Sequence, residues 1–290
     1  MSSIGEKTDT FAVSRDRSVV IITAPRLGDF WGMLFSLPAY VGLFRVFVLR
    51  QISVRYRQSV LGILWVVIQP VATTLVVLFM FKIIGADTSG GMPAGLFTFV
   101  GVLTWQFFSR GVQDGTMSLR NNSNILTKIY FPRIILPISG VLTAWFEIAV
   151  TIALLLLICV VQGIPISSRV VMLPVFLVLL SLTALAISLW LAPLNALIRD
   201  VTFILPFALQ FGMFASPVLF GEQLVPDKWK LAFHLNPVST LIEGVRWSIF
   251  RDQPAPDMLY LAMNTGTIFV LLLGGLVVFQ KFESPVVDRI

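Results

Sequence analysis

The sequence is nearly free of the residues from which most catalytic and metal sites are built. It has 290 residues but only one cysteine, Cys159, and one histidine, His234. A single cysteine inside an apolar run supports neither a disulfide framework nor a thiolate metal site. A single histidine argues against the usual zinc and Ser-His-Asp constellations. We therefore expect no metal, no cofactor and no catalytic residue, and the chain is predicted not to be an enzyme.

Charged residues are also scarce. They make up 12% of the chain against 57% hydrophobic residues, and the mean hydropathy is +0.89. Soluble domains carry about 25% charged residues, so the chain is predicted to be an integral membrane protein embedded in a lipid bilayer. Its net charge is +6, but the basic residues adjoin apolar runs rather than exposed aromatic side chains. Anionic lipid headgroups explain them better than a nucleic acid, and no nucleic-acid partner is expected.

The sequence contains no GxxxxGK[ST] phosphate loop and no soluble segment large enough for a nucleotidase. If transport is driven by ATP, a separate polypeptide must hydrolyse it. An ion-coupled secondary transporter would show inverted repeats and several intramembrane acids, and neither is clear here. A membrane-bound transferase would show clustered acids or histidines near one interface, and the single histidine does not supply such a cluster.

The stretch 50–70 changes abruptly from basic to apolar. At helical spacing Arg50, Ser53 and Arg57 share one face, whereas Arg55 falls toward the apolar side. This layout predicts an amphipathic helix lying in the headgroup plane directly before the first membrane span.

Six apolar segments predict an all-α integral membrane fold with six transmembrane helices. The expected spans are about 61–81, 96–108, 134–161, 170–198, 201–220 and 259–279. The polar stretch 109–133 is predicted to be a cytoplasmic loop with a short helix, and 221–256 an excursion on the outer face. Residues 1–37 are predicted to form a cytoplasmic N-terminal tail, and residues 38–290 the transmembrane domain.

Six spans place both termini on one side, which the distribution of basic residues predicts to be the cytoplasm. All but six of the 21 lysines and arginines fall on that side, as the positive-inside rule requires. The six on the outer side are Lys82, Arg169, Lys228, Lys230, Arg246 and Arg251.

Two features inside the spans are candidates for function. Glu147 lies in the third span, where a charged side chain costs about 2.5 kcal/mol or more unless it is paired or hydrated. Glu147 has two interpretations. In the functional one it lines a hydrated path or pairs with another helix, and in the other it is protonated or its side chain reaches an interface. The fifth span carries a helical stripe of aromatic residues: Phe203, Phe207, Phe211 and Phe214. Such a stripe either packs or lines a passage in which flat rings stack against sugar faces. Trp65, near a span end, has an aromatic belt as its alternative explanation.

Several motifs resemble those of a known family. RYRQSVLGILW and QP within 50–70 resemble the polysaccharide and polyol-phosphate ABC exporter permeases, which include O-antigen and teichoic-acid export permeases. NILTKIYFP at 124–132 is similar to the coupling-helix segment of that family. Further positions resemble the pattern in the second half of that family's sequences: Arg199-Asp200-Val201, Ser216-Pro217, Asn236-Pro237 and Arg246. The resemblance covers most of the chain from Arg50 onward.

The resemblance implies the membrane-spanning permease subunit of an ATP-driven exporter for a lipid-linked polysaccharide. The expected partners are a separate ATP-binding cassette subunit, a second copy of the chain and an undecaprenyl-linked glycan, in the bacterial cytoplasmic (inner) membrane. An ABC permease for drugs or small amphiphiles is the alternative, and an ion-coupled transporter the next one.

The resemblance also assigns expected roles to residues. The ATPase-coupling residues are Arg50, Arg55, Arg57, Asn124, Leu126, Lys128, Arg199 and Asp200. The channel-lining residues are Trp65, Glu147, Phe203, Phe207, Phe211 and Phe214. Short gate helices are expected on the outer face between spans five and six, with Ser216, Pro217, Asn236, Pro237 and Arg246 at the outer gate.

Overall fold

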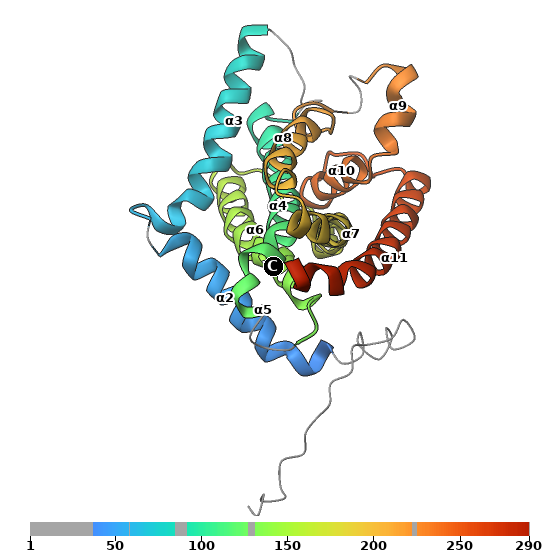
Figure 1. Cartoon of the computed structure of the whole chain (residues 1–290). Coiled ribbons are helices and arrows are strands. Elements are labelled where there is room, and N and C mark those ends of the chain that lie inside the picture. Colours follow the sequence, from blue (N-terminus) through green and yellow to red (C-terminus); the bar gives the residue numbers. More distant parts are fainter. Residues whose placement is uncertain (1–36, 58, 85–91, 127–130, 222–224, 290) are drawn as a thin grey trace, which may run out of the picture. The chain divides into compact units, whose positions relative to one another are not determined.

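A computed structural model describes residues 37–57, 59–84, 92–126, 131–221 and 225–289 (Figure 1). Nearly all of the N-terminal tail expected at 1–37, and Lys128, lie outside the described residues. The described part of the chain is helical, and its only strand-like pairing is an isolated bridge between Ile166 and Phe250. The all-α prediction is therefore confirmed.

The helices follow the order of the predicted segments. The bounds are α2 Val41–Tyr56, α3 Trp65–Ile84, α4 Ala94–Asn121, α5 Ser123–Leu126, α6 Ile135–Val161, α7 Leu173–Leu197, α8 Val201–Phe214, α9 Asp227–His234, α10 Pro237–Ile249 and α11 Met258–Arg289. Short 3-10 turns precede three of them: η2 Leu37–Tyr40, η3 Gly62–Leu64 and η4 Ser168–Met172.

Four helical segments are long and apolar enough to cross a membrane. They are Gly62–Ile83, Ile135–Val161, Ser168–Leu197 and Met258–Phe282. α4 has the length to cross, with 28 residues, but it carries charged side chains. α8 is apolar but has only 14 residues. At 1.5 Å per residue it spans about 21 Å, which is short of the roughly 30 Å hydrocarbon core. The four long helices make the chain a multi-pass membrane protein.

The core is built around α4, which packs against α3, α6 and α7, while α11 packs on α7 (Figure 1). Small residues let these backbones approach closely, as is common between helices in membranes. A Cβ built on Gly140 of α6 would lie 2.7 Å from the carbonyl of Asp114 and 2.8 Å from the amide nitrogen of Gly115. The backbones of α4 and α6 therefore touch at this point, one turn of α4 away from Arg110 and two turns of α6 away from Glu147.

α3 and α8 lie at the edge of this core. α3 buries a narrow stripe, with Val66, Pro70, Thr74 and Val77 spaced at i, i+4, i+8 and i+11. α8 buries only two of its residues, Leu205 and Leu209. Each helix therefore presents a broad apolar face that the described part of the chain leaves uncovered.

α2 and α3 meet at an elbow, as Figure 1 shows in blue. Gly62 lies in the elbow with φ of +51°, in the left-handed region that favours glycine. Arg50, Ser53 and Arg57 are exposed, as the predicted polar face requires. Apolar residues such as Val54 are exposed as well, so the amphipathic division of α2 is only partly present.

The prediction of a loop at 109–133 is wrong for its first half. α4 continues without a break from Ala94 to Asn121, and residues such as Val112 and Ser118 are buried in it. The polarity that suggested a loop comes from side chains that find partners inside the fold, which removes the reason for the helix to end. The expected short helix is present as α5.

The fifth predicted span is also shorter than expected. The helix ends at Phe214 instead of Phe220, and residues 215–220 form turns. The residue before a proline is disfavoured in the helical region, and Pro217 follows Ser216 in this stretch. Beyond it, α9 and α10 occupy the positions where short helices were expected.

We expect Gly140→Ala to destabilise the protein by about 1–3 kcal/mol, because the new methyl group would meet backbone atoms that have no room to move. Thermal unfolding of the detergent-purified protein measures this loss. Gly266→Ala on α11 is the matched control, since a Cβ there meets nothing within 4 Å. Equal unfolding midpoints for the two variants would contradict the close approach of α4 and α6.

Candidate functional site

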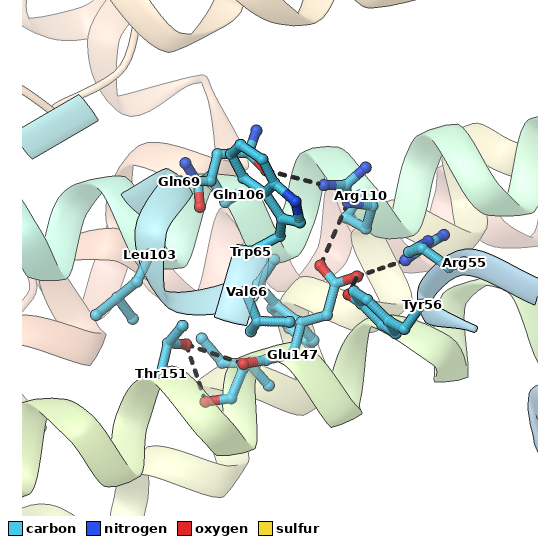
Figure 2. Close-up of a pocket in the computed structure, with 12 residues that line it drawn as sticks. Arg55, Tyr56, Trp65, Val66, Gln69, Leu103, Gln106, Arg110, Glu147 and Thr151 are labelled. Carbon is cyan, nitrogen blue, oxygen red and sulfur yellow. Dashed lines mark hydrogen bonds and ion pairs between the residues drawn. The ribbon is translucent and has the colours of Figure 1, made fainter. Parts of the chain in front are cut away.

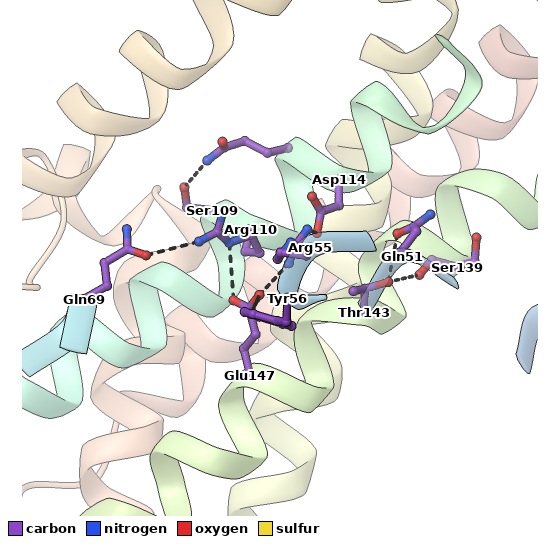
Figure 3. A network of polar contacts seen from close by, with 11 residues as sticks. Gln51, Arg55, Tyr56, Gln69, Ser109, Arg110, Asp114, Ser139, Thr143 and Glu147 are labelled. Carbon is purple, nitrogen blue, oxygen red and sulfur yellow. Dashed lines mark hydrogen bonds and ion pairs between the residues drawn. The ribbon is translucent and has the colours of Figure 1, made fainter. Parts of the chain in front are cut away.

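Arg55, at the last turn of α2, bridges two helices of the core (Figure 3). Its Nη2 donates to Oδ2 of Asp114 on α4 at 2.5 Å, and its Nη1 donates to Oε1 of Glu147 on α6 at 2.5 Å. All three side chains are largely buried, with 24%, 18% and 16% of their surface exposed. Hydrogen-bonded ion pairs with this geometry are the usual way to keep charges within a membrane protein.

Arg110 on α4 is a second cation on the same carboxylate. Its Nε lies 3.3 Å from Oε2 of Glu147, and its Nη2 donates to Oε1 of Gln69 on α3 at 3.3 Å. Arg55, Arg110, Asp114 and Glu147 together form what we name the charge cluster. The charge cluster contains two positive and two negative groups, and it links α2, α3, α4 and α6.

A further hydrogen bond holds the C-terminal end of α2 at the charge cluster. The Tyr56 hydroxyl donates to Oε1 of Glu147 at 2.7 Å. Burial, with the hydrogen bond to Glu147 and the charge of that carboxylate, raises the pKa of Tyr56 to about 12. Burial alone would lower the pKa of Arg55, but Asp114 and Glu147 raise it above its ordinary value. At neutral pH Tyr56 therefore keeps its proton to donate and Arg55 keeps its charge.

Two further contacts attach α2 to the core. Oγ1 of Thr143 on α6 donates to Oε1 of Gln51 at 2.9 Å. Nη1 of Arg50 donates to Oδ1 of Asn122 at 3.3 Å, directly before α5. α2 is thus bonded along its length to both α6 and the end of α4.

A cavity of about 230 Å³ lies beside the charge cluster (Figure 2). Besides Arg55, Arg110 and Glu147, it is lined by Tyr56, Trp65, Gln69 and Gln106 among others. Figure 2 shows the Trp65 ring beside Gln69 and Gln106, above Glu147. The lining combines guanidinium, carboxylate, amide and aromatic groups, which suits a polar ligand or water.

A second chain of polar contacts reaches the beginning of α8. Nη1 of Arg120, in the last turn of α4, donates to Oγ1 of Thr202 at 3.4 Å. Thr202 donates to Oδ1 of Asn195 on α7 at 2.7 Å. The turn containing Arg199 and Asp200 is exposed and precedes this contact. The beginning of α8 is therefore attached to the end of α4 that leads into α5.

The aromatic stripe of α8 lies on the surface of the described chain. The four rings are between 55% and 69% exposed, and those of Phe207 and Phe211 are 4.6 Å apart between centroids. Large apolar groups that remain this exposed in one chain mark a surface for lipid, a partner or a ligand.

The structure brings some of the predicted site residues together and separates others. Arg55 of the coupling set and Glu147 and Trp65 of the channel set meet at the cavity, whereas the four phenylalanines lie on α8. Among the remaining coupling residues, Arg57 and Asn124 are exposed, Leu126 is buried and Lys128 lies outside the described residues.

The predicted outer-gate residues form a second group. Nδ2 of Asn236 donates to Oγ of Ser216 at 2.9 Å, and Arg246 bonds to backbone on α4 and after α8. Pro217 is buried, and Pro237 is the first residue of α10.

Sequence reasoning missed Asp114, Arg110 and Tyr56 as parts of the site. The first two were assigned to a loop, although their spacing of four residues places them on one helical face. Gly111 and Gly115 beside them were the available signal, because small residues at this spacing indicate close helix packing in membranes. Tyr56 follows Arg55 directly and carried no signal of its own.

A family described as "ABC-2 type transporter" matches residues 42–250, which include the charge cluster and Arg246. A Myxococcus xanthus protein named "O-antigen export system permease protein RfbA" is 32% identical over 258 residues, covering 88% of this chain and 98% of that protein. A Klebsiella pneumoniae protein of the same name is 24% identical over 252 residues, covering 87% of this chain and 96% of that protein.

We expect Arg55→Met to destabilise the protein by about 2–3 kcal/mol, because it leaves two carboxylates without their shared cation. This loss of stability is smaller than that expected for a fully buried ion pair, because the three side chains are partly exposed. Arg57→Met is the matched control two residues away, where an exposed arginine is expected to change stability by no more than about 0.5 kcal/mol. Unfolding midpoints in detergent compare the two, and equal losses would count against the charge cluster.

Proposed function

The chain belongs to the ABC-2 type transporter family, and on this premise we propose that it is the membrane permease subunit of an ATP-driven polysaccharide exporter. The cargo proposed is a glycan of the O-antigen type linked to an undecaprenyl lipid. The observation that carries this proposal is the 32% identity to a named O-antigen export permease over 98% of its length. The membrane proposed is the bacterial cytoplasmic membrane, crossed six times, with both termini in the cytoplasm.

ATP hydrolysis is assigned to a separate ATP-binding subunit. Its proposed docking surface consists of the exposed side of α2, α5 and the turn before α8, which carry Arg50, Arg57, Asn124, Arg199 and Asp200. The contact of Arg50 with Asn122 and that of Arg120 with Thr202 support this grouping, since they attach α2 and α8 to the same end of α4.

Movement of the docking surface would reach α3 through the charge cluster. α2 is bonded to Glu147 through Arg55 and Tyr56, and Glu147 is bonded through Arg110 to Gln69 of α3. Bonds of this kind resist separation in a medium without water, so a displacement of α2 is passed on rather than absorbed. We assign to the charge cluster the role of transmitting nucleotide-driven movement into the wall of the passage.

The passage itself is proposed to lie between two copies of the chain. In a single copy the two cavities that border the charge cluster hold only about 230 and 410 Å³, which is too small for a glycan chain. The uncovered apolar faces of α3 and α8 support an arrangement in which a twofold axis brings them together around a conduit. In that arrangement the rings of α8 stack against sugar faces without a tight polar grip.

The segment between α8 and α11 is proposed to close the outer end of the passage. An ion-coupled carrier is less well supported, because both acids of the charge cluster are paired with arginines. Exposed rings would also suit a small amphiphile, so a drug exporter of the same family is the alternative. Removing the permease separates these functions: a glycan exporter loses surface polysaccharide and accumulates the lipid-linked glycan inside, whereas a drug exporter leaves both unchanged.

The proposed ATPase partner is tested by co-purification from detergent with an ATP-binding cassette subunit co-expressed from the same genome. We expect a stoichiometric complex whose ATPase activity falls at least about tenfold in Arg57→Glu, because a reversed charge on the docking surface is desolvated against the partner. Arg251→Glu, an exposed arginine at the opposite end of the fold, is the control and should leave complex and activity intact. A chain that purifies alone would overturn the ATP-driven exporter.

The aromatic stripe gives a separate prediction. Phe207→Ala combined with Phe211→Ala should lower polysaccharide export about tenfold or more while ATPase activity and the unfolding midpoint change little, since both rings are more than half exposed. Phe269→Ala with Val270→Ala, on the exposed side of α11, is the matched control. Equal export by the two double variants would show that the stripe does not face the cargo.

A further inference from the structure

The chain reverses direction after α8 in a segment that has no regular structure yet is buried. Residues 215–220 form turns, and Ser216 and Val218 are completely buried. Backbone carbonyls in such a segment lack the intrahelical partners that a spanning helix provides. In a membrane protein an unpaired carbonyl is costly, so a protein group must supply the missing hydrogen bond.

Arg246 on α10 supplies the missing hydrogen bond. The arginine is 2% exposed, and its Nη2 donates to the carbonyl of Val218 at 3.0 Å and to that of Phe97 on α4 at 3.2 Å. Its guanidinium carbon also lies 3.6 Å from the centre of the Phe97 ring. One side chain therefore joins α10, the outer end of α4 and the segment that follows α8.

Gly101 makes room for this contact. A Cβ at position 101 would collide with the carbonyl oxygen of Val218 and would lie 2.5 Å from Nη2 of Arg246. Neither neighbour has space to withdraw, because both are buried and bonded to each other. Gly101 is the recess on α4 into which the arginine and the carbonyl fit. We name the four residues that meet here the outer clamp: Phe97, Gly101, Val218 and Arg246.

α10 is held at its other end as well. Asn236 caps the helix by accepting from the amide of Val238 and donates to Ser216. Asn264 of α11 donates to Oγ1 of Thr240 at 2.8 Å and to the carbonyl of His234 at 3.0 Å. Ten of the 13 residues of α10 are buried. α9 contacts α10 and, through His234, also α11, while its Lys228 and Trp229 are exposed.

We propose that Arg246 is a positioning residue that clamps the reversal after α8 to α4, so that α10 is a fixed wall of the outer end and not a moving gate. The identification of that end as the exit of the passage rests on the proposed function. The clamp itself follows from the contacts of the isolated chain. The outer end then opens by movement of elements that do not belong to the outer clamp, and the contacts of Arg246 remain intact.

The clamp is tested by the rate at which a water-soluble maleimide labels Leu219→Cys in purified protein carrying Cys159→Ser. Leu219 is half-buried beside Val218, so its labelling reports release of the reversal. Arg246→Met and Gly101→Ala are each expected to raise the rate about tenfold or more, since either change breaks a buried charge-assisted hydrogen bond. Arg246→Lys, which keeps a charged donor, should restore much of the protection. A parental rate in Arg246→Met overturns the clamp.

Two controls separate the clamp from general loosening. Gly266→Ala introduces the same methyl group on α11 where nothing lies within 4 Å, and it should leave the rate unchanged. Leu180→Cys reports on the fully buried core, and it should remain unlabelled in every variant. Labelling of the Leu180→Cys reporter in step with the Leu219→Cys reporter would mean global unfolding and would overturn a local role for Arg246.

The coupling between the two sides of the clamp is tested by a double variant. Gly101→Ala should increase the labelling rate by a smaller factor in the Arg246→Met background than in the parent protein. The reason is that the guanidinium displaced by the new methyl group is already absent in that background. Fully multiplicative effects would show that the two residues act independently and would contradict the shared clamp.

The fixed position of α10 is tested on the complex with the ATP-binding subunit. The labelling rate of the Leu219→Cys reporter should be the same at rest and during ATP turnover, and a rise during turnover would make the segment a moving gate. If no ATP-binding subunit associates, the proposed function fails, while the labelling of the chain alone still decides the clamp.

Discussion

A charged side chain inside a membrane protein must find a partner within the protein, because the surrounding lipid offers none. Glu147 is the residue on which this constraint acts most strongly here, since it lies inside the apolar helix α6 and is held by Arg55, Tyr56 and Arg110. These contacts determine where α2 ends, allow α4 to continue through a polar stretch and attach α3 to the core. The joining of α2, α3, α4 and α6 depends on this one carboxylate.

The reversal after α8 follows the same constraint with a different group. There a backbone carbonyl, that of Val218, loses its helical partner through the early end of α8, and a buried arginine on α10 donates to it. The charge cluster joins α2 to α3, which fits the proposed transmission of movement. The outer site joins three buried segments to one another, which fits a fixed boundary. As proposed, two arginines at different sites of one bundle thus have opposite mechanical roles.

Much of the fold could be predicted because apolar length alone determines which segments cross a bilayer. The segments at 134–161 and 170–198 agree with α6 and with η4 and α7 to within a few residues. Prediction failed where polarity was taken as proof of exposure. Arg110 and Asp114 were assigned to a loop, yet they lie in α4 because Glu147 and Arg55, far away in the sequence, neutralise them. No local pattern states which distant residue will be the partner.

The sequence by itself determined that the chain is an α-helical membrane protein, that it carries no phosphate-loop motif and that Glu147 needs a partner, because these points follow from composition and residue order. Only the tertiary structure decided that Arg55 pairs with Asp114 and Glu147, that Gly140 lets α6 touch α4, and that Gly101 receives Arg246. These outcomes depend on helix rotation and on backbone distances of a few ångströms, which arise from packing between segments that are remote in the chain.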